Sequence, residues 1–265
     1  MFFLYACSDK PDEQELQEKQ EAINNLNLEI PEVEAIFEKY GYIGSFIMLD
    51  LKTNEKFYYN KERCSERFSP ASTFKIPNSL IALETGVASG KDFTLKWDGK
   101  QRFLSEWNKD HTLSTAIKYS VVWYYQELAR RIGHDRMKEY INKIDYGNNN
   151  INGAIDKFWL NDTLKISQEE QIAFLKKLNR NELPFSEKAM NTVKEIMLRN
   201  DNEDYKIFAK TGGAKEVGWY VGWVEANNNT YIFALNIERK DPLDKFLSDR
   251  IVISHELMKH YGIIP

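Results

Sequence analysis

Residues 69–77 read SPASTFKIP and place Ser72 three positions before Lys75. If a helix begins here, both side chains project from the same side of it. A serine hydroxyl is a weak nucleophile unless a base lies nearby, and a lysine ammonium is no base. The Lys75 amine therefore needs either a pKa lowered by burial or a chemical conversion. Taken alone, the S-x-x-K spacing is equally typical of a capped helix with a solvated lysine.

Two further motifs follow in chain order. Residues 210–213 read KTGG and end the strand-like stretch KIFAK, where a lysine and two glycines favour close approach of an anionic substrate to the backbone. Residues 120–122 read SVV, and Ser120 offers a second hydroxyl that can relay protons. The alternatives are a β-turn for KTGG and a helix-interior serine for SVV. Chance rarely produces all three motifs in this order.

Strand patterns occupy both ends of the chain, and helical patterns occupy its middle. Residues 44–51 and 56–60 predict a hairpin, and three further strands are predicted at 206–210, 216–224 and 230–238. Helices are predicted at 31–40, 74–83, 113–131, 135–144, 167–178 and 246–262, with a capping box from Ser167 to Glu170. We therefore expect one α/β (α+β) domain over residues 23–265. It comprises an antiparallel sheet from both chain ends, flanked by helices, with an inserted helical lobe.

With these motifs the chain resembles the class D (oxacillinase-type) serine β-lactamases from about residue 41 to residue 264. The matching stretches are PASTFKIPNSLIALETG (70–86), SVV (120–122), YGN (146–148), FWL (158–160), KTG (210–212), GWYVGWVE (218–225) and FALNIE (233–238). S-x-x-K, a middle serine motif and K-T-G are shared by penicillin-binding proteins and serine β-lactamases. The resemblance implies the β-lactamase/transpeptidase-like fold and hydrolysis of the β-lactam ring of penicillin-type antibiotics, which confers resistance.

The resemblance also implies catalytic roles. Ser72 is the acylated nucleophile, and Lys75 takes up carbon dioxide or bicarbonate to become a carbamate that acts as general base. Trp159 donates a hydrogen bond to that carbamate. Ser120 passes a proton to the β-lactam nitrogen, and Lys210 assists electrostatically. No metal and no organic cofactor is implied.

Further residues are expected to bind the substrate. The N–H groups of Ser72 and Gly213 would form the oxyanion hole, and Thr211 would lie near the substrate carboxylate. Val122 and Leu160 would flank the modified lysine and limit water access. The complete predicted set of substrate-binding residues is Val122, Tyr146, Leu160, Thr211, Gly212 and Gly213.

Two positions depart from the family pattern. Gly213 stands where the family usually has a bulky residue, which implies a more open site with an altered substrate preference. Asp244 occupies the place where the family tends to have an arginine for the substrate carboxylate. Arg250, Lys245 and Arg239 are the alternatives for that role, and the sequence does not choose among them.

Composition excludes several other classes of function. A formal net charge of −4 argues against a nucleic-acid binder. The chain has four histidines, none of them in the three motifs, which argues against a Ser-His-Asp triad. The spacing of His255 and His260 resembles the zinc-protease pattern H-E-x-x-H but contains one residue too many. On a helix they stand roughly 140° apart and cannot share a metal.

The N-terminal residues 1–22 are interpreted as a truncated lipoprotein signal followed by a polar stalk. Cys7 follows Leu-Tyr-Ala, as in a lipid-attachment site, although the preceding apolar segment is short. We therefore expect an exported protein, periplasmic or at the cell surface, tethered to the membrane if Cys7 is lipidated.

Two rival functions share the motifs. One is a β-lactam sensor, which stays acylated, and the other is a D,D-peptidase or an inactive interaction module. The absence of several membrane-spanning segments argues against a sensor, and the YGN and FWL stretches favour the hydrolase over the second rival. The substrate spectrum, carbapenems included, and the oligomeric state are not predicted.

Overall fold

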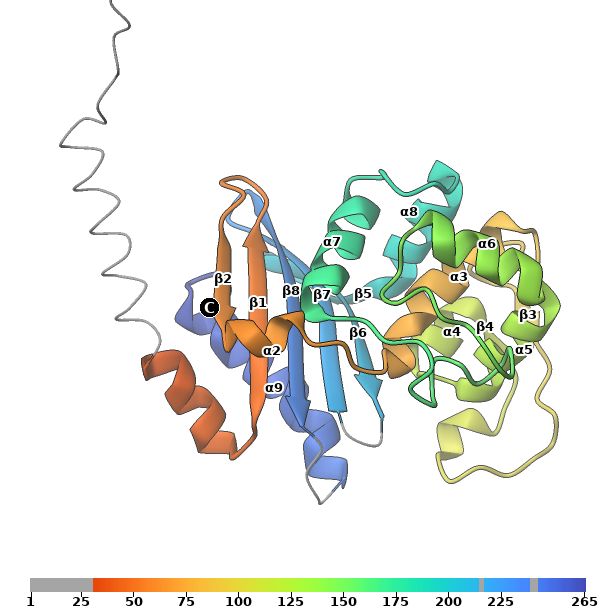
Figure 1. The fold of residues 1–265 in the computed structure, drawn as a ribbon, viewed down its shortest axis with the longest axis horizontal. Helices are drawn as coiled ribbons and strands as arrows, with labels where there is room; N and C mark the ends of the chain where they lie inside the picture. The colour runs from red at the N-terminus through yellow and green to blue at the C-terminus, as the bar shows by residue number, and fades with distance from the viewer. Residues whose placement is uncertain (1–30, 215–216, 239–242) are drawn as a thin grey trace, which may run out of the picture.

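One six-stranded antiparallel sheet brings together strands from both ends of the chain (Figure 1). The computed structural model describes residues 31–214, 217–238 and 243–265. The strand order is β2-β1-β8-β7-β6-β5, so the first hairpin lies beside the last strand. The bounds are β1 (Gly44–Asp50), β2 (Lys56–Tyr59), β5 (Leu198–Asp201), β6 (Tyr205–Gly213), β7 (Val217–Ala226) and β8 (Asn229–Glu238). A separate two-stranded sheet contains β3 (Thr94–Leu95) and β4 (His111–Thr112).

The strands largely match the sequence prediction. Strand β6 continues through Gly213, where it pairs with Gly218, so the KTGG motif is strand and not the alternative β-turn. Asn227 and Asn228 make the turn between β7 and β8, both with positive φ (52° and 54°), as a tight hairpin turn requires. The short edge strand β5 was not predicted, because its residues LRND carry no alternating apolar pattern.

Helices fill the middle of the chain and cover the sheet. They are the helix at residues 31–40, α2 (Lys61–Ser65), α3 (Lys75–Glu84), α4 (Leu113–Lys118), α5 (Val122–Ile132), α6 (His134–Lys143), α7 (Gln168–Asn179), α8 (Glu187–Met197) and α9 (Leu243–His260), with 3₁₀ helices η1 (Ala71–Phe74) and η2 (Ser105–Trp107). The predicted capping box is confirmed, since Ser167 accepts from the Glu170 N–H and Glu170 accepts from the Ser167 N–H.

Two apolar cores lie on opposite faces of the sheet. On one face the helix at residues 31–40 packs through Val33 and Phe37, and α9 packs through Phe246 and Ile253. The other face is covered by the helical lobe, whose core includes α3, α5, α7 and α8. Figure 1 shows this lobe beside the sheet as the inserted middle of the chain. The predicted fold class is thereby confirmed.

The predicted continuous helix over residues 113–131 is wrong. The structure has two helices, α4 and α5, and the chain breaks between them at Ser120. Ser120 has φ = 55°, in the left-handed region that a right-handed helix cannot contain. The alternative of a helix-interior serine is therefore also wrong.

Several sequence predictions fall on residues outside those described. These are the signal and stalk at residues 1–22 with Cys7, and the alternative carboxylate ligand Arg239. Within the described ranges, no helix combines the length and the apolar character needed to cross a membrane.

Candidate active site

Ser72 and Lys75 meet where η1 passes into α3. The Lys75 amine Nζ donates a hydrogen bond of 2.7 Å to Ser72 Oγ. Lys75 is only 1% exposed, and its amine stands over the ring of Tyr125. Burial lowers the pKa of Lys75 to about 7. A large fraction of the amine is therefore neutral near pH 7, as a base or a carbon dioxide acceptor must be.

The segment that carries Ser72 is anchored from two sides. The indole N–H of Trp219 donates to the carbonyl of Ser69 at 2.8 Å, and the Ser69 hydroxyl donates to the carbonyl of Trp159 at 3.0 Å. Directly before the serine, Ala71 holds φ = 47°, which costs energy for a residue with a Cβ. Such strain persists only because the surrounding contacts fix the segment.

Ser120 and Lys210 form a second pair. The Lys210 amine donates to Ser120 Oγ at 3.0 Å and to the Thr211 carbonyl at 2.8 Å. Lys210 is 2% exposed. Burial is the main cause that holds the pKa of Lys210 well below its usual value, and the nearby positive charges of Lys75, Arg199 and Arg250 add to it. The break between α4 and α5 thus places a hydroxyl against a lysine that resists protonation.

Trp159 lies fully buried, with its ring stacked on Phe74 at a centroid distance of 5.2 Å. Its indole N–H has no hydrogen-bond partner among the described residues, although the atom is buried. Buried N–H groups are rarely left unpaired in native proteins. Phe74 is the residue before Lys75, so this unpaired donor belongs to the same cluster. A hydrogen-bond acceptor attached to the Lys75 amine would give this N–H a partner, so the residues present fit a carbamate on Lys75.

A cavity of about 620 Å³ opens above these pairs. Apolar side chains make much of its wall, and Lys118 and Arg250 are its two cations. No acidic residue is among the described residues that line it. The lining residues are Ser72, Phe103, Leu104, Trp107, Lys118, Tyr119, Ser120, Val122, Leu160, Thr211, Gly213, Ala214, Phe246, Leu247 and Arg250. Such a wall suits a small anionic ligand with an apolar body.

The structure separates the predicted substrate-binding residues into two groups. Val122, Leu160, Thr211 and Gly213 line the cavity. Tyr146 does not, because it is buried in the core with its ring against Phe74, and Gln171 donates to its hydroxyl at 3.5 Å. Tyr146 therefore packs against the residue that precedes Lys75 and does not face the cavity.

Gly212 also lies outside the cavity lining. A Cβ built on it would stand 3.0 Å from the Pro70 carbonyl oxygen, so this glycine lets β6 approach the segment that carries Ser72.

Arg250 stands out among the three basic residues left open by the sequence. It lines the cavity, is 8% exposed, and donates from Nη1 to the Gly212 carbonyl. Lys245 instead pairs with Asp249. Arg250 lies five residues from Lys245 along α9, so the two side chains point to different sides of the helix, and no motif in the sequence marks which side faces the cavity.

Sequence reasoning missed part of the cavity wall. Phe103 is 83% exposed and lies 5.8 Å from the ring of Trp107. The Trp107 indole N–H donates to the Tyr119 carbonyl at 2.9 Å, which fixes that ring at the rim. Phe103 lies in a loop and Trp107 in the one-turn helix η2, and neither segment has a helical or strand period, so only their aromatic character could have suggested them.

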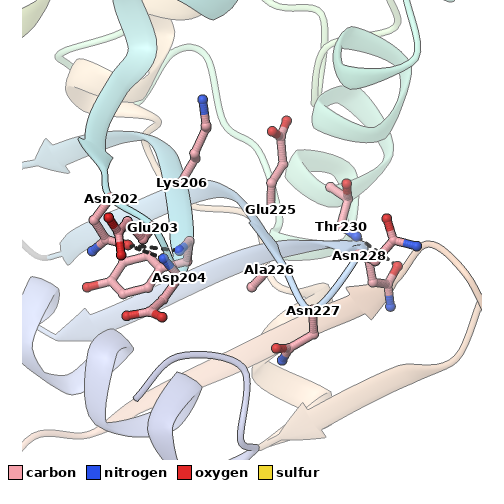
Figure 2. Close-up of a pocket in the computed structure, with 11 residues that line it drawn as sticks. Asn202, Glu203, Asp204, Lys206, Glu225, Ala226, Asn227, Asn228 and Thr230 are labelled. Atoms are coloured by element: carbon pink, nitrogen blue, oxygen red, sulfur yellow. Dashed lines mark hydrogen bonds between the residues drawn. The ribbon is translucent and has the colours of Figure 1, made fainter.

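A different cavity lies at the other end of the sheet. It holds about 550 Å³ and is formed by the β5–β6 and β7–β8 turns (Figure 2). Polar residues such as Asn202, Asp204 and Asn227 surround it, and no residue of the three motifs lines it. Of the motif residues, Ser72, Ser120, Val122, Thr211 and Gly213 line the first cavity instead.

Comparison with known proteins settles the family. The model of the penicillin binding protein transpeptidase domain matches residues 38–259. The chain is 44% identical to beta-lactamase OXA-48 of Klebsiella pneumoniae over 235 residues, 87% of this chain and 88% of the relative. The chain belongs to the class D β-lactamases. It is also 39% identical to the probable beta-lactamase YbxI of Bacillus subtilis (strain 168), over 83% of this chain and 82% of that protein.

Solved structures of class D β-lactamases agree with this assignment. The class D β-lactamase of Sebaldella termitidis ATCC 33386 superimposes with a TM-score of 0.86 at 37% identity, over 88% of this chain and 97% of that one. The class D enzyme YbXI from Nostoc gives 0.84 at 41%, over 88% and 99%. The predictions of family and of a β-lactam hydrolase are confirmed. The roles of individual residues stay predictions.

Proposed function

We propose that this class D β-lactamase opens the ring of penicillin-type antibiotics through an acyl-enzyme on Ser72, with carbamylated Lys75 as general base. Resistance to these antibiotics follows from that hydrolysis. The observation that carries the proposal is the buried Lys75 amine, 2.7 Å from Ser72 Oγ, with a pKa of about 7. A normally charged lysine could neither accept a proton nor take up carbon dioxide.

Carbon dioxide on the Lys75 amine would supply a carboxylate-like base beside Ser72. Trp159 is the residue we assign to hold it, because its indole N–H is buried and has no partner in the described part of the chain. A hydrogen bond from this N–H offsets the cost of placing a negative charge in an apolar environment.

The other residues act on the substrate. The Lys75 carbamate takes the hydroxyl proton of Ser72 as Ser72 Oγ forms a bond to the lactam carbonyl carbon. The ring C–N bond breaks, and Ser120 gives a proton to the leaving nitrogen. The carbamate then takes a proton from the water that hydrolyses the acyl-enzyme and frees Ser72. Lys210 stabilises the Ser120 oxygen as that proton leaves. The N–H groups of Ser72 and Gly213 stabilise the carbonyl oxygen, which carries negative charge in the transition state.

The substrate carboxylate has two partners in this proposal. Arg250 and Thr211 line the same cavity as Ser72, and Arg250 is held there by its bond to the Gly212 carbonyl. A guanidinium pairs with a carboxylate in a fixed planar geometry. Val122 and Leu160 form the apolar wall near Ser72 and limit the access of water.

The decisive experiment follows hydrolysis of a chromogenic cephalosporin with and without bicarbonate. We expect steady turnover that bicarbonate raises, and mass spectrometry should find a transient acyl group on Ser72. Ser72→Ala should abolish both, whereas Ser248→Ala, an exposed serine of α9, should change neither. Stoichiometric acylation with no turnover would instead support the β-lactam sensor.

We also propose that the enzyme is exported and attached to the membrane through a lipid on Cys7. The support is the Leu-Tyr-Ala-Cys sequence before the polar stretch. In a full-length expression strain, Cys7→Ser should move β-lactamase activity from the membrane fraction to the soluble fraction. An unchanged distribution would contradict the lipid attachment.

A further inference from the structure

A smaller cavity of about 400 Å³ lies beside the active-site cavity. Lys118 and Thr211 line both, so these two side chains separate them. The smaller cavity is also lined by Lys210, by Arg199 of strand β5 and by His255 of helix α9. None of the functions assigned above uses Arg199 or His255.

Arg199 owes its position to a β-bulge. Leu198 pairs with Phe208 and Asn200 pairs with Ile207, so Arg199 is the extra residue of β5. A bulge turns the side chain of the extra residue away from the regular pleat. The guanidinium Nη1 donates to the carbonyls of Ile196 at 3.0 Å and Leu198 at 2.9 Å, which holds the group in place. Its remaining N–H groups stay available to a ligand.

The cavity carries positive charge, and its lining in the described part of the chain includes no acidic residue. Lys118 and Arg199 contribute two cationic side chains, and neither has a carboxylate within salt-bridge distance among the described residues. The effect reaches Lys210, whose pKa is held down by burial and then by neighbouring cations that include Arg199. Grouped cations of this kind favour a bound anion.

Two neutral donors complete the cavity. The Tyr220 hydroxyl has no hydrogen-bond partner in the described ranges, and burial raises the pKa of Tyr220 to about 12, so it keeps its proton. The His255 Nε2 atom is buried and likewise lacks a partner there. The two rings lie 6.2 Å apart. The unpaired buried nitrogen of His255 indicates a missing ligand at this cavity.

We propose that this cavity binds a phosphate-type oxyanion, with Arg199 and Lys118 as charged ligands and Tyr220 and His255 as neutral ones. A tetrahedral dianion can accept hydrogen bonds from all four of these side chains at once. It also neutralises more of the positive charge of the cavity than a carboxylate does. The site is distinct from the substrate carboxylate site, which faces Arg250 in the neighbouring cavity. It does not depend on the catalytic roles proposed above.

Inorganic phosphate is the probe for this site. We expect isothermal titration calorimetry at constant ionic strength to show one phosphate bound per wild-type chain, and sulfate should compete for it. Arg199→Gln should weaken phosphate binding about tenfold or more, because it removes a charge-assisted contact. A parallel titration with phenyl phosphate shows whether the natural ligand is a phosphate monoester or free phosphate. Binding comparable to that of inorganic phosphate indicates a monoester, and weaker binding indicates the free ion.

The matched control is Lys206→Gln on strand β6. Lys206 pairs with Asp201, is not part of the cavity lining, and should leave phosphate affinity unchanged. His255→Phe, which keeps a ring but removes both nitrogens, should weaken binding without altering the charge of the cavity. Thermal unfolding of each variant without phosphate checks that it folds. No phosphate binding by the wild-type chain, or equal binding by Arg199→Gln, overturns the proposal.

Discussion

The Lys75 amine lies 2.7 Å from Ser72 Oγ and is almost fully removed from water. The pair combines a hydroxyl that needs a base with an amine whose ordinary pKa of 10.5 is lowered to about 7 by burial. The following predictions test this pair and the residues around it.

The rate of hydrolysis should depend on pH through Lys75. The amine is protonated below pH 7 and neutral above it, and only the neutral form accepts a proton or carbon dioxide. We expect kcat to rise as the pH increases through 7, with bicarbonate restoring part of the loss on the acidic side. A kcat profile with its inflection near 10.5 would mean that Lys75 is not the titrating base.

Replacement of Lys75 should separate activity from stability. Lys75→Ala should give a folded protein without turnover. Lys75→Met should also be inactive but more stable than the parent in buffer free of carbon dioxide, since burying a lysine costs about 1.4 kcal/mol per unit of lowered pKa. Between pH 7 and 10.5 the unfolded state binds more protons, so the parent gains stability as pH rises.

The stability difference between Lys75→Met and the parent should therefore be greatest below pH 7 and shrink toward pH 10.5. Urea unfolding at several pH values measures it. Turnover by Lys75→Ala comparable to the parent would remove Lys75 from the mechanism altogether.

Trp159→Phe tests the unpaired indole N–H. Phenylalanine keeps an aromatic ring against Phe74 but lacks the donor, so the Lys75 carbamate should form less readily. We expect a higher bicarbonate concentration for half-maximal activity, read also from the ¹³C signal of labelled carbamate. Trp223→Phe, whose N–H donates to Glu225, is the control and should not shift the bicarbonate dependence.

Gly212→Ala should lower activity more than stability. The added Cβ would lie 3.0 Å from the Pro70 oxygen and 3.0 Å from Thr73 Cγ2, so β6 and η1 must move apart. Displacing Ser72 by about 1 Å can cost on the order of 100-fold in rate. Gly90→Ala meets no atom within 4 Å and is the control. Unchanged kcat in Gly212→Ala would show that the contact does not position Ser72.

Arg250→Gln should raise the KM for penicillins about tenfold or more, because a hydrogen bond to a charged group is worth about 1.5–3 kcal/mol. The matched variant is Lys245→Gln, which removes the basic residue paired with Asp249 outside the cavity lining. Its KM should stay that of the parent. Equal increases in both variants would indicate a general loss of positive charge and not a carboxylate contact.

The sequence predicts an element of the fold correctly where residues close together in the chain determine that element. The apolar strands β7 and β8 and the capping box at Ser167 are local signals, and both are confirmed. Ser120 was placed inside one long helix because apolar periodicity continues from α4 into α5. The left-handed turn at Ser120 depends on tertiary contacts with Lys210, which no local pattern contains.

The active site divides in the same way. Ser72, Lys75 and Lys210 are marked by motifs, and the structure brings them around one cavity or directly beneath it. The choice of Arg250 over Lys245 required the three-dimensional position of α9 relative to β6. The charges of the two residues, which are the same, could not show which of them faces the cavity.

The pairing of β1 with β8 has a consequence for how the chain reaches this state. Gly44 lies opposite Ile237, so the earliest strand has its partner almost at the end of the sequence. During synthesis the hairpin of β1 and β2 therefore has no sheet to join until nearly the whole chain has emerged. Contacts this distant in sequence make folding slow and leave strand edges exposed meanwhile. The active site, which needs β6 against η1, is among the last parts of the molecule to become complete.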